Sequence, residues 1–233
     1  MITTLGSAWK LGDLRRKMLF TLAMLLVFRI GVHIPVPGIN IKVIEDLIAK
    51  GQLLGFFDII SGGAFKNFSI FAMSITPYIN ASIIMQLLTV VVPYFERLAK
   101  EGQEGRKKMT EYTRYGTVIL GFIQALGISV GLRSAILNPG WGSTLIIALS
   151  LTAGTAFLMW LGELITEKGV GNGISLIIFA GIVSRVPSGV VAIYEYLAAG
   201  TTNIFVILIF AIVALAVIAV IVAIQEGQRR IPV

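Results

Sequence analysis

The sequence predicts an all-α polytopic membrane protein with six transmembrane helices, and two observations lead to this fold class. Hydrophobic residues make up 56% of the 233 residues and charged residues only 13%, whereas soluble proteins average about 25% charged residues. The apolar residues are also gathered into long runs, and a helix needs about 20 apolar residues to cross a bilayer. Turn-forming and charged residues separate these runs, as is typical of connections between helices.

The first span is predicted over residues 18–33, and a Pro-rich turn at residues 35–38 ends it. Arg29 lies inside this span near one end, where a guanidinium either extends to the headgroups or binds a buried partner. Residues 1–17 mix Leu and Trp with Lys and Arg, a pattern typical of an amphipathic segment in the headgroup region. An unattached tail is the alternative for that segment.

The second span is broken. An apolar run at residues 53–60 is too short to cross a bilayer, and a Ser-Gly-Gly sequence at 61–63 ends it. A second run at 69–93 is long enough, yet it carries Pro77, Asn80 and Gln86 inside it. A broken helix with polar groups at membrane depth usually lines a water-filled space. The sequence therefore predicts a pore or a carrier with this stretch at its lining.

Four more spans follow a charged connection at residues 94–115, for which we expect a loop. They are predicted at 117–132 with Gln124 at depth, at 144–165, at 172–197 with an interruption around 185–189, and at 203–224. Between two of these spans lie Gly169, Gly171 and Gly173. A helix rather than a strand precedes these glycines, which argues against a phosphate-binding loop and favours a tight reversal of the chain.

Positive charges are divided unequally between the two sides of the predicted membrane protein. Of the 19 Lys and Arg residues, 13 fall on the side of the N-terminal segment and 5 on the other side. The positive-inside rule therefore places both termini of this chain in the cytoplasm, on a face that attracts anionic lipids. This organisation comprises a cytoplasmic segment at 1–17, a transmembrane region at 18–225 and the start of a cytoplasmic loop at 226–233.

The residue counts exclude several kinds of site. The chain has no Cys and a single His, His33, so we predict no metal centre and no cofactor. No pairing of a nucleophile with a base and no pair of intramembrane carboxylates suggests catalysis, so we predict no catalytic residue and no enzyme. An ion-coupled carrier usually has an acid near the bilayer midplane, and the lack of one makes a carrier the weaker alternative.

One face of the 69–93 run carries branched apolar residues. Helical geometry places Ile75, Ile79 and Ile83 on this face together with Gln86. Two interpretations are open. Periodicity alone favours ordinary helix packing, and the other interpretation is a narrow apolar constriction around a pore.

Two long motifs resemble the signatures of the SecY family of protein-conducting channels. They are SIFAMSITPYINASIIMQLL at 69–88 and WLGELITEKGVGNGISLII at 160–178. The shorter sequences YTRYG at 112–116 and EGQRR at 226–230 resemble loop motifs of the same family, in the same order. The family has ten spans in two halves related as an inverted repeat. The resemblance covers the first half, so the implied fold is one six-helix half-channel.

The resemblance implies roles for particular residues. The segment 56–67 corresponds to the plug of the closed channel, and its glycines and charges lead us to expect weak packing there. This prediction covers Phe56, Phe57, Asp58, Ile59, Ile60, Ser61, Gly62, Gly63, Ala64 and Phe65. The pore ring corresponds to Ile75, Ile79 and Ile178, and the lateral gate to Asn80, Ile83, Gln86 and Gln124. The cytoplasmic partner surface corresponds to Arg106, Lys107, Lys108, Arg229 and Arg230.

Partners and location are implied as well. Substrates would be signal peptides and unfolded polypeptides, and subunits would be of the SecE and SecG type. The SecA ATPase or a ribosome would dock at the cytoplasmic face of a bacterial plasma membrane. Because only one half is present, we also expect that two copies can pair as a homodimer of halves. The alternatives are a small-solute secondary carrier and a non-conducting membrane scaffold.

Overall fold

The computed structural model describes residues 12–50, 55, 57–59 and 61–227. The chain divides into two compact units, Met1–Arg185 and Val186–Val233. Within the described residues, helices are joined by turns and by two isolated β-bridges, which pair Pro35 with Ser69 and Ile39 with Ile136. The all-α prediction is therefore confirmed for this part of the chain.

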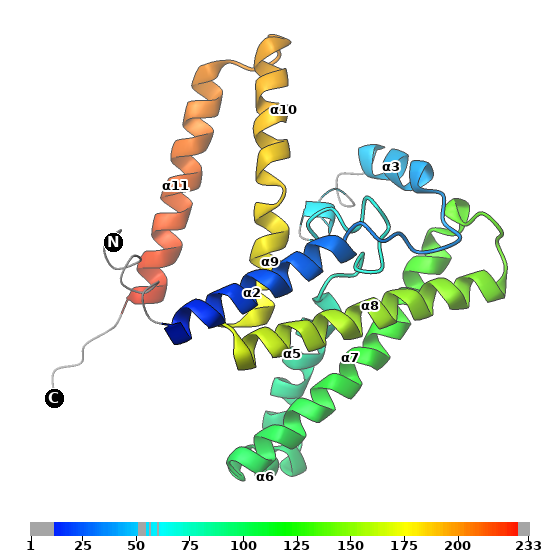
Figure 1. The fold of residues 1–233 in the computed structure, drawn as a ribbon, viewed down its shortest axis with the longest axis vertical. Coiled ribbons are helices and arrows are strands. Elements are labelled where there is room, and N and C mark those ends of the chain that lie inside the picture. Colours follow the sequence, from blue (N-terminus) through cyan, green and yellow to red (C-terminus); the bar gives the residue numbers. More distant parts are fainter. Residues whose placement is uncertain (1–11, 51–54, 56, 60, 228–233) are drawn as a thin grey trace. The chain divides into compact units, whose positions relative to one another are not determined.

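The helices can be followed in Figure 1. In the first unit they are Gly12–Gly31 (α2), Ile41–Lys50 (α3), Thr76–Val91 (α5), Pro93–Lys100 (α6), Gln103–Gly131 (α7), Trp141–Lys168 (α8) and Gly173–Val183 (α9), with a 3-10 helix at Arg133–Ala135. In the second unit they are Val186–Ala198 (α10) and Ile204–Glu226 (α11).

Helix α8 is the centre of the first unit, because α7, α9 and α2 all pack against it. Helices α7 and α8 pack against each other, and Figure 1 shows that they cross. Five buried residues of α7 are small and spaced four positions apart: Thr113, Thr117, Gly121, Ala125 and Ser129. A face of small residues lets two membrane helices approach closely. The Thr117 and Ser129 hydroxyls donate to carbonyls of the preceding turn at 2.7 and 2.8 Å. Both buried hydroxyls therefore have a hydrogen-bond partner within α7.

The core beside α8 joins elements that are distant in the sequence. Phe28 of α2, Ile75, Leu161 of α8 and Ile177 of α9 belong to one cluster of buried side chains. Phe71 is stacked between Phe28 and Phe157, with ring centroids 6.1 and 5.9 Å apart. The turns that precede α5 are therefore held between α2 and α8 by large apolar side chains.

Length and apolar composition identify the helices that can cross a membrane. Within the described residues four stretches qualify: Gln103–Gly131, Trp141–Lys168, Gly173–Ala198 and Ile204–Glu226. A fifth is possible if α5 and α6, which are bent by 100° relative to each other, count as one span. Helix α2 carries Asp13, Arg15, Arg16, Lys17 and Arg29 within its 20 residues. The count of six spans stays a prediction.

The predicted helix at 69–93 is wrong at its start. Helix α5 begins only at Thr76, and residues 61–75 form turns. Phe68 and Ser74 have positive φ angles of 40° and 53°, which a continuous right-handed helix does not contain. Pro77 then lies in the first turn of α5, the place where a helix tolerates proline.

The predicted loop at 94–115 is also wrong, because α6 and the first turns of α7 occupy it. This stretch is rich in Glu, Lys and Arg, which have high helix propensity. Charged residues at this density are compatible with a helix outside a membrane as well as with a loop. Residues 12–17 likewise belong to α2, so the predicted boundary at residue 17 is not a helix start. The interruption of the fifth apolar run is confirmed, since α9 ends at Val183 and α10 begins at Val186.

Candidate functional site

The candidate site is built around the residues from Asp58 to Ser69, called here the 58–69 segment, of which residue 60 lies outside the described part. Its turns are held by two polar side chains. The Asp58 carboxylate accepts a hydrogen bond from the backbone N–H of Lys66 at 2.7 Å. The Ser61 hydroxyl donates to the Asp58 carbonyl and accepts from the Phe65 N–H, both at 3.1 Å. These bonds satisfy backbone groups that have no helical partner, which buried backbone requires.

The 58–69 segment is well packed. Ala64 and Phe68 are fully buried, and Phe65 is nearly so. Ala64 belongs to the cluster of Phe28 and Ile75, whereas Phe65 and Phe68 belong to a second cluster with residues of α7 and α8. The expectation of weak packing, made for the plug at 56–67, is therefore wrong for Ala64 and Phe65, which enter the core, whereas Phe57 and Ile59 of the same plug are 54% and 50% exposed.

Polar contacts join the segment to α2 and to the end of α9, and another joins α2 to the end of α9. Arg29 of α2 donates from Nη1 to the Gly62 carbonyl at 2.8 Å and to the Ser184 hydroxyl at 3.1 Å. Arg185 forms an ion pair with Asp58, which is only 6% exposed. Of the two interpretations of Arg29, the buried partner is the one confirmed.

Close backbone approach makes these contacts possible. Gly62 has a φ of +66°, and a Cβ at this position would lie 2.6 Å from the Cα of Gly181 in α9. Only glycine therefore fits here without moving either backbone.

The other end of the segment is joined to the chain that follows α2. The Phe68 carbonyl accepts from the Val36 N–H at 2.9 Å, and the Ile70 N–H donates to the Ile34 carbonyl at 3.0 Å. Lys66 pairs with Glu45 of α3 at 3.4 Å, with both side chains nearly half exposed. The segment is thus bound through a buried pair on one side and an exposed pair on the other.

The three isoleucines predicted for the pore ring lie in one cluster. Ile75 is 1% exposed, and Ile79 and Ile178 are partly buried and pack against the same cluster. The structure therefore brings them together. It places Ile75 in the interior of this chain and leaves part of Ile79 and Ile178 uncovered.

The residues predicted for the lateral gate are divided. Asn80 is partly buried, whereas Ile83 and Gln86 are exposed on α5. Gln124 of α7 lines a recess of about 180 Å³. The recess is also lined by Phe57, Ser61 and Phe65. Gln124 therefore lies beside the 58–69 segment, and Asn80, Ile83 and Gln86 do not line this recess.

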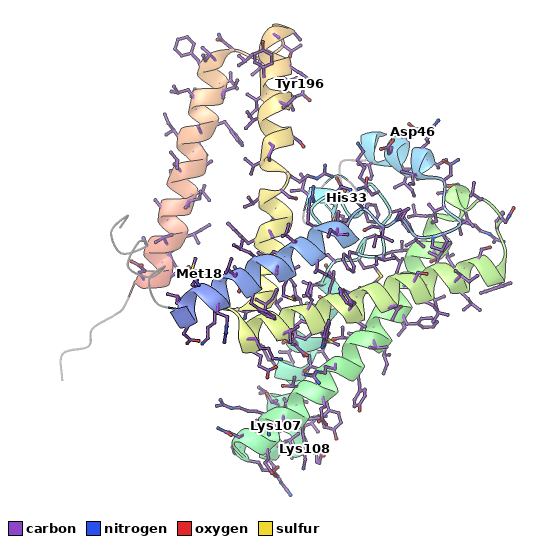
Figure 2. The ribbon with its side chains drawn as sticks, viewed as in Figure 1. Met18, His33, Asp46, Lys107, Lys108 and Tyr196 are labelled. Carbon is purple, nitrogen blue, oxygen red and sulfur yellow. The ribbon has the colours of Figure 1, made fainter. Side chains whose placement is uncertain are left out.

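The predicted basic surface lies where α6 meets α7. Arg106, Lys107 and Lys108 are exposed near the start of α7, and Figure 2 shows Lys107 and Lys108 at the α6 end of that helix. Sequence reasoning missed the aromatic side chains beside them. Phe95 packs edge-on against both Tyr94 and Tyr112, with ring centroids 5.3 and 5.5 Å apart. Nearby on α6, Lys100 donates a hydrogen bond that lowers the pKa of the exposed Glu96 carboxyl.

The reversal between α8 and α9 is confirmed. Asn172 caps α9, because its side-chain oxygen accepts from the N–H groups of Ile174 and Ser175 at 3.0 and 3.2 Å. The backbone at Gly173 passes so close to α8 that a Cβ there would lie 2.1 Å from the Gly162 carbonyl oxygen. The glycines serve chain reversal.

Some predicted residues lie outside the described part, namely Phe56, Ile60, Arg229 and Arg230. Sequence reasoning also missed Ser184 and Arg185 as partners of the 58–69 segment. A signal was present, since Arg185 is a charged residue inside an apolar run, and such residues usually have a specific partner.

Comparison with known proteins gives a consistent result. A family model described as SecY matches residues 69–233. Several curated relatives are named protein translocase subunit SecY. The relative from Halalkalibacterium halodurans is 54% identical over 100% of this chain and 56% of the relative. The relative from Bacillus subtilis is 49% identical with the same coverage. The relative from Escherichia coli K12 is 46% identical over 96% of this chain and 52% of the relative. The chain thus spans about half the length of these relatives.

Solved structures with a similar fold are channel proteins. Sec61 in the canine ribosome-channel complex from the endoplasmic reticulum has a TM-score of 0.67 and 21% identity, over 95% of this chain and 50% of that chain. A second structure, described as a protein conducting channel, has a TM-score of 0.61 and 20% identity, over 82% of this chain and 43% of that chain. At these identities the similarity establishes the fold.

Proposed function

Because the chain belongs to the SecY family, we propose that it supplies the N-terminal half of a channel that moves unfolded polypeptides across a membrane. The observation that carries the proposal is that most of the 58–69 segment, from residue 61 onward, is non-helical and largely buried between apolar helices. Irregular backbone at membrane depth is tolerated where it is enclosed by protein or lines a water-filled cavity. A segment of this kind is suited to close a pore.

The 58–69 segment is proposed as the plug. Its buried apolar side chains and its satisfied backbone groups support a role as a stopper that stays folded inside the channel. Displacing it would expose Phe65 and Phe68 together with the buried Asp58 carboxylate. Opening is therefore expected to require a partner that compensates for these losses, such as an arriving signal peptide.

The pore ring is proposed to consist of Ile79 and Ile178, with Ile75 supporting them from behind. The uncovered parts of Ile79 and Ile178 can face a pore, whereas the buried Ile75 fixes the start of α5 against α8 and α9. A narrow apolar ring excludes ions because a hydrated ion cannot lose its water there.

The lateral gate is proposed to follow α5 and α7. Ile83 is 50% exposed, and it shares the α5 surface with Gln86. Because α5 and α7 pack against each other, an apolar signal segment would leave between this helix pair and the other half of the channel, and so enter the bilayer. Gln124 and the recess beside Phe57 would lie at the inner end of this route.

Six spans in a bacterial plasma membrane, with both termini of this chain cytoplasmic, complete the proposal. Helix α2 would be the first span, and the contacts of Arg29 with Gly62 and Ser184 support this because they remove its charged group from lipid. The basic face of α6 and α7 would then lie in the cytoplasm, available to anionic lipids and to SecA or a ribosome. SecE- and SecG-type subunits would complete the channel.

The test uses the absence of Cys from this chain. Single cysteines are placed at Ile79, Ile83 or Val213 of the intact protein, and a signal-bearing polypeptide arrested in transit carries a crosslinker. Val213 is the matched control, since it is 54% exposed and Ile83 is 50% exposed. We expect strong crosslinks at positions 79 and 83. Crosslinking at these positions no stronger than at 213 would rule out the proposed path.

A homodimer of halves is a second proposal for the chain when it occurs alone. The exposed apolar side chains of α5 support it, because a half-channel leaves its inner face uncovered. Mass measurement of the chain in nanodiscs tests it. A strictly monomeric chain at high concentration would contradict it.

A further inference from the structure

Four residues form a polar network that binds the 58–69 segment to the rest of the first unit, with Asp58 buried and the other three partly buried. They are Arg29 of α2, Asp58 of the segment, and Ser184 and Arg185 at the end of α9. The network joins three stretches of sequence, with Arg29 and Ser184 separated by 155 positions. We propose that this network, called here the latch, holds the plug in its closed position, and the inference rests on the proposed function.

The charges of the latch make Asp58 its central member. Two guanidinium groups approach the segment, and among the described residues Asp58 is the acid paired with either of them. Asp58 also accepts from the Lys66 backbone at 2.7 Å, so its carboxylate both shapes the segment and binds α9. Removing one partner of a buried pair leaves an uncompensated charge, which is strongly unfavourable.

Directional contacts distinguish the latch from the apolar packing around it. Phe65 and Phe68 gain from burial in any apolar surroundings, since the hydrophobic effect has no direction. The bond from Arg29 to Gly62 and the pair of Arg185 with Asp58 exist only in one position of the segment. The latch therefore specifies where the plug is seated, and apolar burial supplies most of its affinity.

The test measures how often the 58–69 segment leaves its closed position. A cysteine replaces the fully buried Ala64 in the intact protein in proteoliposomes, and the rate of its reaction with a soluble maleimide reports exposure of the segment. We expect Asp58→Asn and Arg185→Gln to raise this rate about tenfold or more, because each removes one partner of a pair whose side chains are only 27% and 8% exposed. The double variant D58R/R185D should restore part of the protection by re-forming the pair.

The matched control is Glu45→Gln. It removes an ion pair to the same segment, but one whose side chains are 47% and 43% exposed, so the labelling rate should stay within about twofold of the wild type. The latch would be overturned if the cysteine at position 64 reacted no faster in Asp58→Asn than in this control. It would also be overturned if that cysteine reacted as fast in D58R/R185D as in Asp58→Asn.

A second reporter separates release of the plug from general unfolding. A cysteine at Ala148, which is fully buried in α8, should keep its low rate in every variant. If Asp58→Asn accelerates labelling at position 148 too, that variant has unfolded, and Arg185→Gln decides the question, because it removes the other partner of the same pair. An unchanged rate at position 64 in Arg185→Gln would then overturn the proposal.

Ion leak from the same proteoliposomes distinguishes the latch from the proposed function. Faster labelling at position 64 together with increased leak supports both. Faster labelling without leak keeps the latch and contradicts the role of the segment as a plug. Increased leak without faster labelling contradicts the latch alone.

Discussion

Arg114 of α7 and Glu163 of α8 form a two-point ion pair. The guanidinium Nε lies 2.9 Å from Oε1, and Nη2 lies 2.8 Å from Oε2. Arg114 belongs to the YTRYG sequence and Glu163 to the WLGEL sequence, so the pair joins two of the motifs that resemble the SecY family. The Glu163 side chain is 20% exposed, which protects the pair partly from solvent.

Arg114→Lys is expected to destabilise the contact between α7 and α8. Lysine keeps the charge but cannot make both parallel hydrogen bonds, so the free energy of unfolding should fall by about 1 kcal/mol. Unfolding in mixed micelles measures it. Lys100→Gln is the control, because it breaks the more exposed pair with Glu96 and should change stability by less than about 0.5 kcal/mol. Equal effects of the two substitutions would contradict the prediction.

Gly173→Ala is expected to strain the reversal between α8 and α9. The added Cβ would lie 2.1 Å from the Gly162 carbonyl oxygen, and relief requires a backbone shift that costs about 1–3 kcal/mol. Gly127→Ala is the control, because nothing lies within 4 Å of a Cβ there and alanine favours helix. Thermal unfolding compares the two. A Gly173→Ala protein as stable as the control would show that the reversal adapts freely.

Asn172→Ala is expected to weaken the start of α9. Its side chain accepts from two backbone N–H groups, and loss of such a cap costs about 1 kcal/mol. Asn203 occupies the same position in α11 without a side-chain cap bond, so Asn203→Ala should have a smaller effect. Hydrogen exchange at the first turns of α9 and α11 measures both. Similar increases in exchange at the two sites would refute the assignment.

Substitutions at Ile75 and Ile79 should have different effects, because Ile75 is buried and Ile79 is partly uncovered. Ile75→Ala removes side-chain volume from the core, so the free energy of unfolding should fall by about 2–5 kcal/mol. Ile79→Asn, at a partly uncovered position, should instead increase ion leak through the intact protein in proteoliposomes, because a polar group helps to hydrate the constriction. Val213→Asn is the control for an added amide at an exposed position. A leak as large from the control would contradict the assignment of Ile79 to the ring.

Local features of the sequence predicted much of the fold. The runs at 144–165 and 203–224 correspond to α8 and α11, because long apolar stretches bounded by polar residues leave few alternatives to helix in a membrane. The interruption near 185 and the reversal at 169–173 also follow from local residue types. The stretch at 94–115 is helical rather than a loop, because Glu, Lys and Arg favour helix when they lie outside a membrane.

The candidate site was predictable only in part. The Ser-Gly-Gly sequence and the motif at 69–88 indicated where the chain breaks and which residues matter. They did not indicate that Ile75 is buried or that Gln124 shares a recess with Phe57. They also did not indicate that Phe65 and Phe68 of the 58–69 segment are packed in the core. Each of these depends on neighbours from other helices, which periodicity along one helix does not reveal.

Run length, composition and ordered motifs are enough to predict the all-α membrane class, most of the apolar helices and membership of the family. The contacts of Arg29 with Gly62 and Ser184, and the pair of Arg185 with Asp58, become visible only in the folded chain. A charged group in an apolar setting must find a partner, and the sequence reveals that requirement without identifying the partner. Folding brings Arg29 and Ser184, 155 positions apart, into contact, and the same Arg29 side chain donates to Gly62 of the 58–69 segment.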